Sequence, residues 1–179
     1  MRFVSRWEAG VELVAPAIEH KKAAMDYRQE HFDCGEMELH GDGGLDHANT
    51  YVGWLEKIRA DKIRPFTEEL VPATVYFGMR SGRIVGMLQI RHRLNKRLLK
   101  TYGNIGYGIR PSERRKGYAT QLLAAALIIC RDMGLDKVLV SCDKKNIGSA
   151  KTILKNGGIL SNEFIDVDGS VVQQYWITL

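Results

Sequence analysis

Several features that define common protein classes are scarce or missing in this sequence of 179 residues. Its three cysteines have no paired spacing, which favours reduced thiols in a cytoplasm over a disulfide framework. No apolar stretch approaches the length needed to cross a bilayer, so no membrane partner is expected. Arg2 and Arg6 are not followed by a continuous apolar segment, and we therefore expect no secretory signal. These absences predict a cytoplasmic protein.

Two familiar phosphate-binding motifs are also missing. The sequence contains no G-x-x-x-x-G-K-[ST] loop for a nucleoside triphosphate. The segment GNIGYG (103–108) has its glycines in the reverse order of the dinucleotide fingerprint, and it lies within a predicted strand instead of after one. We therefore expect neither of these nucleotide sites.

The composition is that of an ordinary globular protein, with 45% hydrophobic and 26% charged residues. The net charge of +5 would tolerate an anionic partner, either nucleic acid or a phosphorylated small molecule. No basic stripe interleaved with aromatic residues and no recognition helix is evident, so nucleic acid is not the expected partner. No linker or repeat interrupts the chain, which predicts a single domain over 1–179.

Hydrophobic spacing predicts the element order β-α-α-β-β-β-α-β-α-β-β. The fold class is therefore α/β, with a mixed, mostly antiparallel sheet flanked by helices. The strand–helix–strand unit over 103–142 should be parallel and right-handed, and the hairpins on either side should be antiparallel. The expected strands are 11–16, 73–80, 83–94, 102–110 and 137–142, followed by a hairpin over 158–179 turned at Asp168 and Gly169, and the expected helices are 17–30, 47–63, 119–133 and 146–156.

A basic loop precedes the third predicted helix. Four cations (Arg110, Arg114, Arg115 and Lys116) surround one acid there, although the start of a helix already carries partial positive charge. No Ser, Thr, Asp or Asn stands immediately before the helix to cap it, and Gly117 allows a ligand to approach the backbone closely. These features describe a cradle for a phosphate or diphosphate. The alternative is a solvated basic loop with a helix end capped by water.

The residues RRKGYA (114–119) match the [Q/R]-x-x-G-x-[G/A] signature of the GNAT superfamily of N-acetyltransferases, and the chain resembles its bacterial members. The segment CDKKNIGSAKTILKNGG (142–158) resembles the family's second cofactor segment. The resemblance implies a cofactor-binding core over about 103–158, in which the loop binds the diphosphate of acetyl-CoA through backbone N–H groups. The residues implied to contact the cofactor are Ile109, Arg114, Arg115, Lys116, Gly117, Tyr118, Ala119, Thr120 and Asn146.

The resemblance also implies the reaction, which is direct transfer of an acetyl group from acetyl-CoA to a primary amine in a ternary complex. The strands 103–110 and 137–142 should splay apart, so that the pantetheine arm enters the gap and pairs with the free strand edge near Ile109. A backbone N–H at this edge can polarise the thioester carbonyl. A base, or a water chain to a base, must take a proton from the amine.

The sequence departs from the family at the usual catalytic acid. Many members have a tyrosine seven residues after the cofactor asparagine, and here that position is Ile153. Tyr107 and His92 are candidate catalytic residues, against the alternatives of a packed tyrosine and an exposed histidine at a strand end. Cys142 is interpreted as a structural thiol, since no partner histidine is identifiable. Asn146 can be a helix cap, a cofactor contact or both.

The five carboxylates over 33–46 indicate a cationic acceptor, such as a polyamine, an aminoglycoside or a lysine-bearing peptide, or simply a soluble loop. His31, His40, His47 and Cys34 fit no familiar ligand spacing, so no metal is expected. The missing tyrosine leaves a second function open, a non-catalytic module that binds CoA or acetyl-CoA. Exposed strand edges leave a homodimer open.

Overall fold

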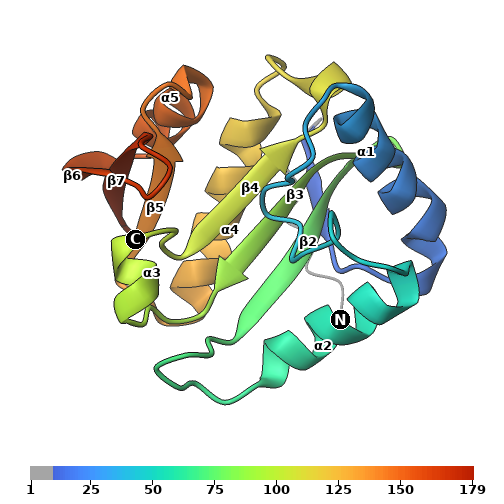
Figure 1. The fold of residues 1–179 in the computed structure, drawn as a ribbon, viewed down its shortest axis with the longest axis horizontal. Helices are drawn as coiled ribbons and strands as arrows, with labels where there is room; N and C mark the ends of the chain where they lie inside the picture. The colour runs from blue at the N-terminus through green and yellow to red at the C-terminus, as the bar shows by residue number, and fades with distance from the viewer. Residues whose placement is uncertain (1–9) are drawn as a thin grey trace.

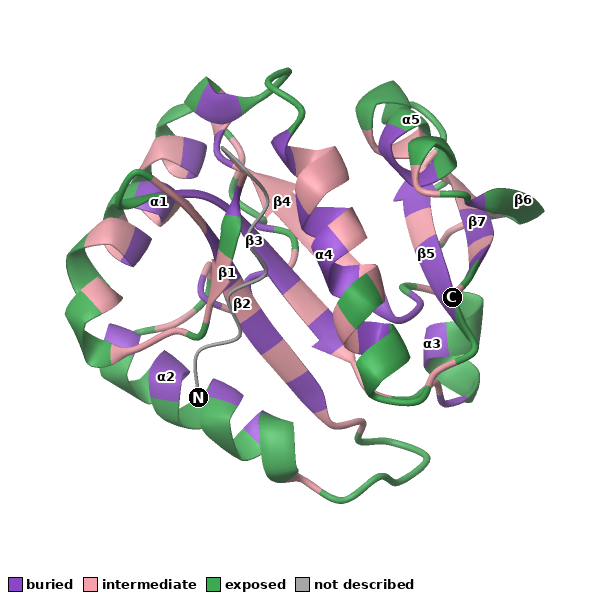
Figure 2. Ribbon diagram, turned by 180° about the vertical axis from the view of Figure 1, so that it is seen from behind, coloured by how far each residue is buried: buried purple, intermediate pink, exposed green. Residues whose placement is uncertain are grey.

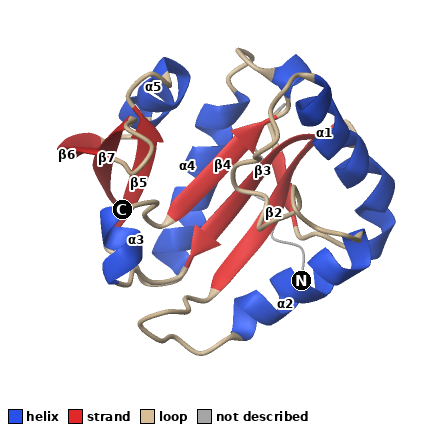
Figure 3. Cartoon of the chain, viewed as in Figure 1, coloured by secondary structure: helices blue, strands red, loops and turns tan. Residues whose placement is uncertain are grey.

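The computed structural model describes residues 10–179. Arg2 and Arg6, on which the expectation about a secretory signal depends, lie outside the described residues. Within residues 10–179 the chain forms seven strands and five α-helices (Figures 1 and 3). These are β1 (Glu12–Val14), α1 (Lys21–Asp33), α2 (Tyr51–Ile63), β2 (Ala73–Arg80), β3 (Arg83–Arg91), α3 (Lys96–Lys100), β4 (Ile105–Ile109), α4 (Tyr118–Asp132), β5 (Lys137–Asp143), α5 (Ile147–Lys155), β6 (Ile159–Ile165) and β7 (Val171–Thr178).

The first sheet has the order β1-β2-β3-β4, and its neighbouring strands are all antiparallel. Helices α1 and α2 cover one face, and α4 crosses the other (Figure 2). The apolar side chains of α2, which are Tyr51, Trp54, Leu55 and Ile58, are all buried in the core that this helix shares with the sheet. At its centre the ring of Trp54 stacks on that of Phe77, with 5.9 Å between the centroids.

The remaining strands form a separate sheet of order β5-β7-β6, also antiparallel. The predicted fold class is confirmed, but the expected single sheet is divided between β4 and β5. These two strands run in the same direction in Figure 1, as the sequence predicts, and they diverge toward the end at which α4 and α5 begin. Among the described residues no ladder joins them, and their one pairing is an isolated bridge between Gly103 and Val140.

Asn104 joins the two sheets where β4 and β5 come together. Its backbone N–H donates to the Leu139 carbonyl at 2.7 Å, and its side-chain Oδ1 accepts from the Leu139 N–H at 2.9 Å. Its Nδ2 donates to the Arg91 carbonyl at 3.2 Å, and the whole residue is only 2% exposed. Gly103 has φ +68°, and a Cβ atom there would collide with the Leu139 carbonyl. The contact is therefore specific to these residue types.

The register of β3 and β4 leaves one edge of β4 without a strand partner. Arg91 N–H donates to Asn104 O, and at the other end Arg110 N–H donates to Val85 O. In an antiparallel pair, hydrogen-bonded and non-hydrogen-bonded residue pairs alternate. Ile105, Tyr107 and Ile109 lie opposite Ile90, Leu88 and Gly86 in non-hydrogen-bonded pairs. Their backbone groups therefore point away from β3 and into the gap facing β5.

The structure corrects several predicted boundaries. The first predicted helix begins with a 3-10 turn at Ile18–His20, and α1 then continues to Asp33. Helix α2 begins at Tyr51, because the Thr50 side chain accepts from Gly53 N at 3.1 Å and caps it. Helix α3 was not predicted; its cap is Asn95, whose side chain accepts from Leu98 N. Short helices of this kind have no apolar period to detect.

The contact at Asn104 leads to a stability prediction. Asn104→Ala should lower the free energy of unfolding by roughly 2–5 kcal/mol, because the buried Leu139 N–H and Arg91 carbonyl lose partners. Urea unfolding would measure the change, with the exposed Asn49→Ala as the control. An unchanged midpoint for Asn104→Ala would mean that other contacts hold the two sheets together.

Candidate functional site

The N-terminus of α4 has no side-chain cap, as the sequence predicts. Gly117 is the N-cap residue, with φ +83°, and a Cβ atom at this position would have no neighbour within 4 Å. The backbone N–H groups of residues 115–120 make no hydrogen bond to other residues in the range 10–179. A run of free N–H groups at a helix N-terminus is suited to an anion, and Gly117 keeps the approach to them open.

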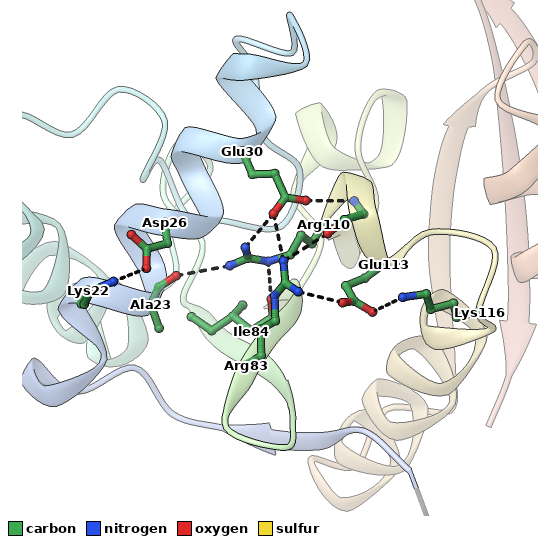
Figure 4. Close-up of polar contacts among 10 residues, drawn as sticks. Lys22, Ala23, Asp26, Glu30, Arg83, Ile84, Arg110, Glu113 and Lys116 are labelled. Carbon is green, nitrogen blue, oxygen red and sulfur yellow. Dashed lines mark hydrogen bonds and ion pairs between the residues drawn. The ribbon is translucent and has the colours of Figure 1, made fainter.

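Arg110, however, does not contribute a free charge to this loop. Its side chain is 5% exposed and lies between α1 and the β2–β3 hairpin (Figure 4). Its guanidinium donates to Glu30 at 2.8 Å and to the Ile84 carbonyl at 2.7 Å, and it stacks over the Tyr27 ring. Arg110 is therefore a structural residue, which corrects its predicted place among the cations that attract a ligand.

Two of the other three cations also have carboxylate partners. Lys116 pairs with Glu113 at 2.8 Å (Figure 4), and Arg114 forms a bidentate pair with Glu36, both contacts being 2.6 Å. Arg115 has no ion pair within the described part of the chain, and its φ is +62°. The loop therefore presents its backbone N–H groups and Arg115, rather than four free cations, to an anion.

The carboxylates of this network are held in the charged form. Burial alone would raise the pKa of Glu30, but hydrogen bonds from Ser112 and Arg110 outweigh burial and lower the pKa to about 2. The hydrogen bonds from Arg114 lower the pKa of Glu36 to about 2. Glu36 also accepts from His31 Nδ1 at 2.8 Å, and burial lowers the pKa of that histidine.

A cavity of about 610 Å³ lies where β4 and β5 diverge. Its walls come from β4, from the end of β5, from the start of α5, and from the loop between α1 and α2. Tyr107 and Asn146 both line it, and the N-termini of α4 and α5 lie at the same end of the molecule (Figure 1). The structure thus brings these two predicted site residues together.

Tyr107 reaches from β4 toward α5. Its hydroxyl lies 2.8 Å from Ser149 Oγ, and burial raises its pKa to about 12. The phenol is therefore protonated at neutral pH and can donate a proton, but it cannot serve as a base. Asn146 caps α5 by accepting from Ser149 N at 3.0 Å, which confirms the cap, while contact with a cofactor stays a prediction.

Three other residues singled out from the sequence lie in positions that do not favour a part in catalysis. His92 lies outside the cavity, where its ring bonds Thr74 Oγ1 at 2.8 Å, and burial lowers its pKa. Cys142 lines the cavity, but burial raises the pKa of its thiol, which disfavours the reactive thiolate. Ile153 is fully buried in the core between α4 and the second sheet.

The acidic loop contributes only part of its charge to the cavity. Glu38, Asp42 and Asp46 line the cavity, whereas Glu36 faces Arg114 and Asp33 bonds Gln29 on the surface of α1. Burial raises the pKa of Asp42. The opposite wall adds two carboxylates that the sequence analysis missed, Asp143 and Asp166, because only the fold brings these residues to the loop.

Two polar residues of β3, Gln89 and Arg91, also line the cavity and were not singled out from the sequence. Their only sequence signal is the two-residue spacing that places both on one face of a strand. Within residues 10–179, no three His, Cys, Asp or Glu side chains gather in a way that could hold a metal ion. Among the same residues, none of the helices has both the length and the apolar character to span a membrane.

Comparisons with known proteins agree with this architecture. Residues 46–159, more than half of the chain, match the model of the acetyltransferase (GNAT) domain. The chain therefore belongs to the GNAT acetyltransferase family. A comparison with curated proteins finds no match.

Solved structures show the same fold at low sequence identity. The ribosomal L7/L12 α-N-protein acetyltransferase RimL in complex with coenzyme A has a TM-score of 0.72 and 15% identity, covering 98% of both chains. The microcin C7 self-immunity acetyltransferase MccE in complex with acetyl-CoA and AMP has a TM-score of 0.67 and 15% identity, covering 97% of this chain and 98% of its own. The structure of yncA from Salmonella typhimurium with its cofactor acetyl-CoA has a TM-score of 0.65 and 13% identity, covering 95% of this chain and 94% of its own.

The buried ion pair behind the loop leads to a prediction about stability and pH. Glu30→Gln should lower the free energy of unfolding at pH 7 by roughly 3 kcal/mol, because Arg110 stays buried without a counter-charge. Glu30 has a folded-state pKa below its ordinary value of 4.5, so its stabilisation is complete above that pH and is lost as pH falls toward 2. Denaturant unfolding measured from pH 7 down toward pH 2 should show a smaller decrease in the free energy of unfolding for the variant than for the wild type.

The matched control is Asp26→Asn, which removes an exposed carboxylate from the same helix (Figure 4). An exposed pair of this kind contributes less than about 1 kcal/mol. Equal losses for the two variants would contradict the assigned role of Glu30.

Proposed function

We propose that this protein transfers the acetyl group of acetyl-CoA to a primary amine of a small molecule or peptide, directly and in a ternary complex. The observation that carries the proposal is the juxtaposition of an uncapped α4 N-terminus with a strand edge that has unpaired backbone groups. Membership of the GNAT family supports it, as do the similar structures that contain CoA or acetyl-CoA. A cytoplasmic setting, in which the three thiols stay reduced, fits this chemistry.

The residues present fit the chemical groups of acetyl-CoA. The free N–H groups of residues 115–120, together with Arg115, would hold the diphosphate, and Gly117 gives it access. The exposed edge of β4 would pair with the amide groups of the pantetheine arm, as an added strand pairs with a sheet. Asn146, at the start of α5, would contact this arm from the other side of the gap. When bound, acetyl-CoA supplies the thioester whose carbonyl carbon is attacked by the amine.

The edge amides of β4 have a second part in the reaction. The N–H groups of Tyr107 and Ile109 point into the gap and have no strand partner there. A donor held in this way can stabilise negative charge that develops on the thioester oxygen, and it needs no rearrangement to do so. The family resemblance implies that this donor would lie near Ile109.

Tyr107 is suited to protonate the departing thiolate. Its pKa of about 12 keeps the phenol protonated, and Ser149 fixes the orientation of the hydroxyl at 2.8 Å. Ser149 lies one helical turn before Ile153, the position at which many family members have their tyrosine. Tyr107 of β4 therefore positions its phenol beside α5, the helix that usually carries the catalytic tyrosine in this family.

The acceptor amine would enter from the acidic side of the cavity. The carboxylates of Glu38, Asp42 and Asp46 line one wall, and those of Asp143 and Asp166 line the other. Their charge would attract a protonated amine, and together with the imidazoles of His40 and His47 they are the available bases within the cavity. The loss of one proton makes the amine nucleophilic.

The cofactor site can be tested by calorimetry. Gly117→Asp should abolish acetyl-CoA binding, because a side chain and a negative charge enter the space of the diphosphate. Gly134→Asp is the matched control, since Gly134 follows the other end of α4, has φ +80° and is equally open. The control should bind with the wild-type affinity. Retained binding in Gly117→Asp would refute the assignment of the diphosphate site.

Turnover tests the reaction itself. Release of CoA thiol from acetyl-CoA should accelerate with some member of an amine panel, and Tyr107→Phe should lower kcat by about 100-fold or more. Acetyl-CoA affinity should stay the same, because the lost hydroxyl contacts only α5. Tyr102→Phe, which alters a second tyrosine of the cavity, should leave kcat unchanged. Full activity in Tyr107→Phe would exclude this residue as the acid.

A further inference from the structure

Arg91 is a cation at the cavity wall without an acidic partner. It is the last residue of β3, and its side chain lines the main cavity and a neighbouring one that extends toward α3. Its Nη1 donates to the Gly103 carbonyl at 3.3 Å, and its guanidinium stacks on the Tyr102 ring with 5.7 Å to the centroid. No carboxylate among residues 10–179 forms an ion pair with it.

The energetic cost of burying this cation indicates that the site is suited to an anionic ligand. A guanidinium has five N–H donors, and one of them has a protein acceptor here. Burial lowers the pKa of Arg91, the neighbouring Tyr102 counteracts this effect, and the cation Arg97 lowers the pKa further. The other cation in the main cavity, Lys57, differs in this respect, because Asp61 neutralises it at 2.7 Å. A partly buried cation without a counter-charge destabilises the folded state unless a ligand supplies the counter-charge.

Gln89 extends this donor surface. It lies two residues before Arg91 on the same strand, so both side chains emerge from one face of the sheet. It lines both cavities with Arg91, and its side chain makes no hydrogen bond to other residues in the described range. A guanidinium fork beside an amide N–H₂ group suits an oxyanion, such as a carboxylate or a phosphate.

We propose that Arg91 and Gln89 bind a carboxylate or phosphate of the acceptor, at the end remote from its reacting amine. This inference rests on the proposed function, because it assigns a second recognition point in the same cavity. The acceptor is then zwitterionic, with its amine among the carboxylates and its anion at Arg91.

The strand register gives the span between the two ends. Leu88 is the ladder partner of Tyr107, and Arg91 lies three residues further along β3. At about 3.3 Å per residue this separates the two positions by roughly 10 Å. A free α-amino acid, whose charges share one carbon, is too short for this span. A short peptide with a free amino terminus and a terminal or side-chain anion fits it.

The experiment compares matched peptides as acceptors. The first pair is Ala-Ala-Ala and its carboxyl-terminal amide, and the second is Ala-Ala-phosphoserine amide and Ala-Ala-serine amide. For the wild type, kcat/KM from CoA release should be at least about tenfold higher for the anionic member of one pair, and that pair identifies the anion. Arg91→Gln should reduce the ratio to about one while leaving the neutral peptide within threefold of the wild type.

Two further variants separate recognition from folding. Arg93→Gln alters an exposed arginine outside the cavity and should keep the wild-type ratio. Gln89→Leu leaves Arg91 in place and should reduce the ratio severalfold, which tests the site even if Arg91→Gln does not fold. Ratios near one in the wild type for both pairs, or a ratio unchanged in Arg91→Gln, would overturn the inference.

A failure of the proposed function gives a different pattern. If no peptide is acetylated, calorimetry with the same peptides on the CoA-saturated protein tests whether the anion site exists without acetyl transfer. If the anionic member of a pair binds more tightly than the neutral member, and Arg91→Gln removes this difference in affinity, the anion site is supported. The proposed acetyl transfer to these peptides is then wrong. Equal binding of both members in each pair would overturn the anion site as well.

Discussion

The divergence of β4 and β5 from one fixed point is the constraint on which the rest of the structure depends. Asn104 satisfies both backbone groups of Leu139 and both backbone groups of Arg91 from a buried position. Because the strands meet there and not beyond, the backbone groups of β4 that face the gap have no strand partner. A continuous sheet would have used those groups for a ladder and closed the cavity. The contact at Asn104 therefore creates the space in which the proposed reaction takes place.

The ion pairs around the proposed cofactor loop link it to the rest of the molecule. Glu30 of α1 holds Arg110 and the N–H of Ser112, so it fixes the path of the chain directly after β4. Glu36, in the loop that lines the acceptor side of the cavity, holds Arg114. The two halves of the proposed active site thus share one electrostatic network. Its charges act mainly on the position of the backbone, whereas the N–H groups at α4 act on the ligand.

The family motif could be predicted from the sequence because the property it encodes is local. Gly117, the lack of a capping residue and the apolar period of α4 are contained within about twenty residues, and the uncapped helix end has the predicted form. The alternating and helical hydrophobic periods likewise indicated the order of the strands and most helices. Boundaries differed where a single side chain decided them, as Thr50 does for α2.

The partners of the charged residues could not be predicted in this way. Arg110 stands in the basic segment but is neutralised by Glu30, 80 residues earlier, and the cavity gathers Asp42, Asp143 and Arg91 from three separate parts of the chain. The sequence position of a charged residue does not indicate where its side chain points. Its partner depends on which strands and helices become neighbours in the fold. The sequence by itself determined the order of the strands and of all helices but α3, the family, and the helix end suited to an anion. Only the tertiary structure decided which charges are free for a ligand, because ion pairing depends on distance through space and not on distance along the chain.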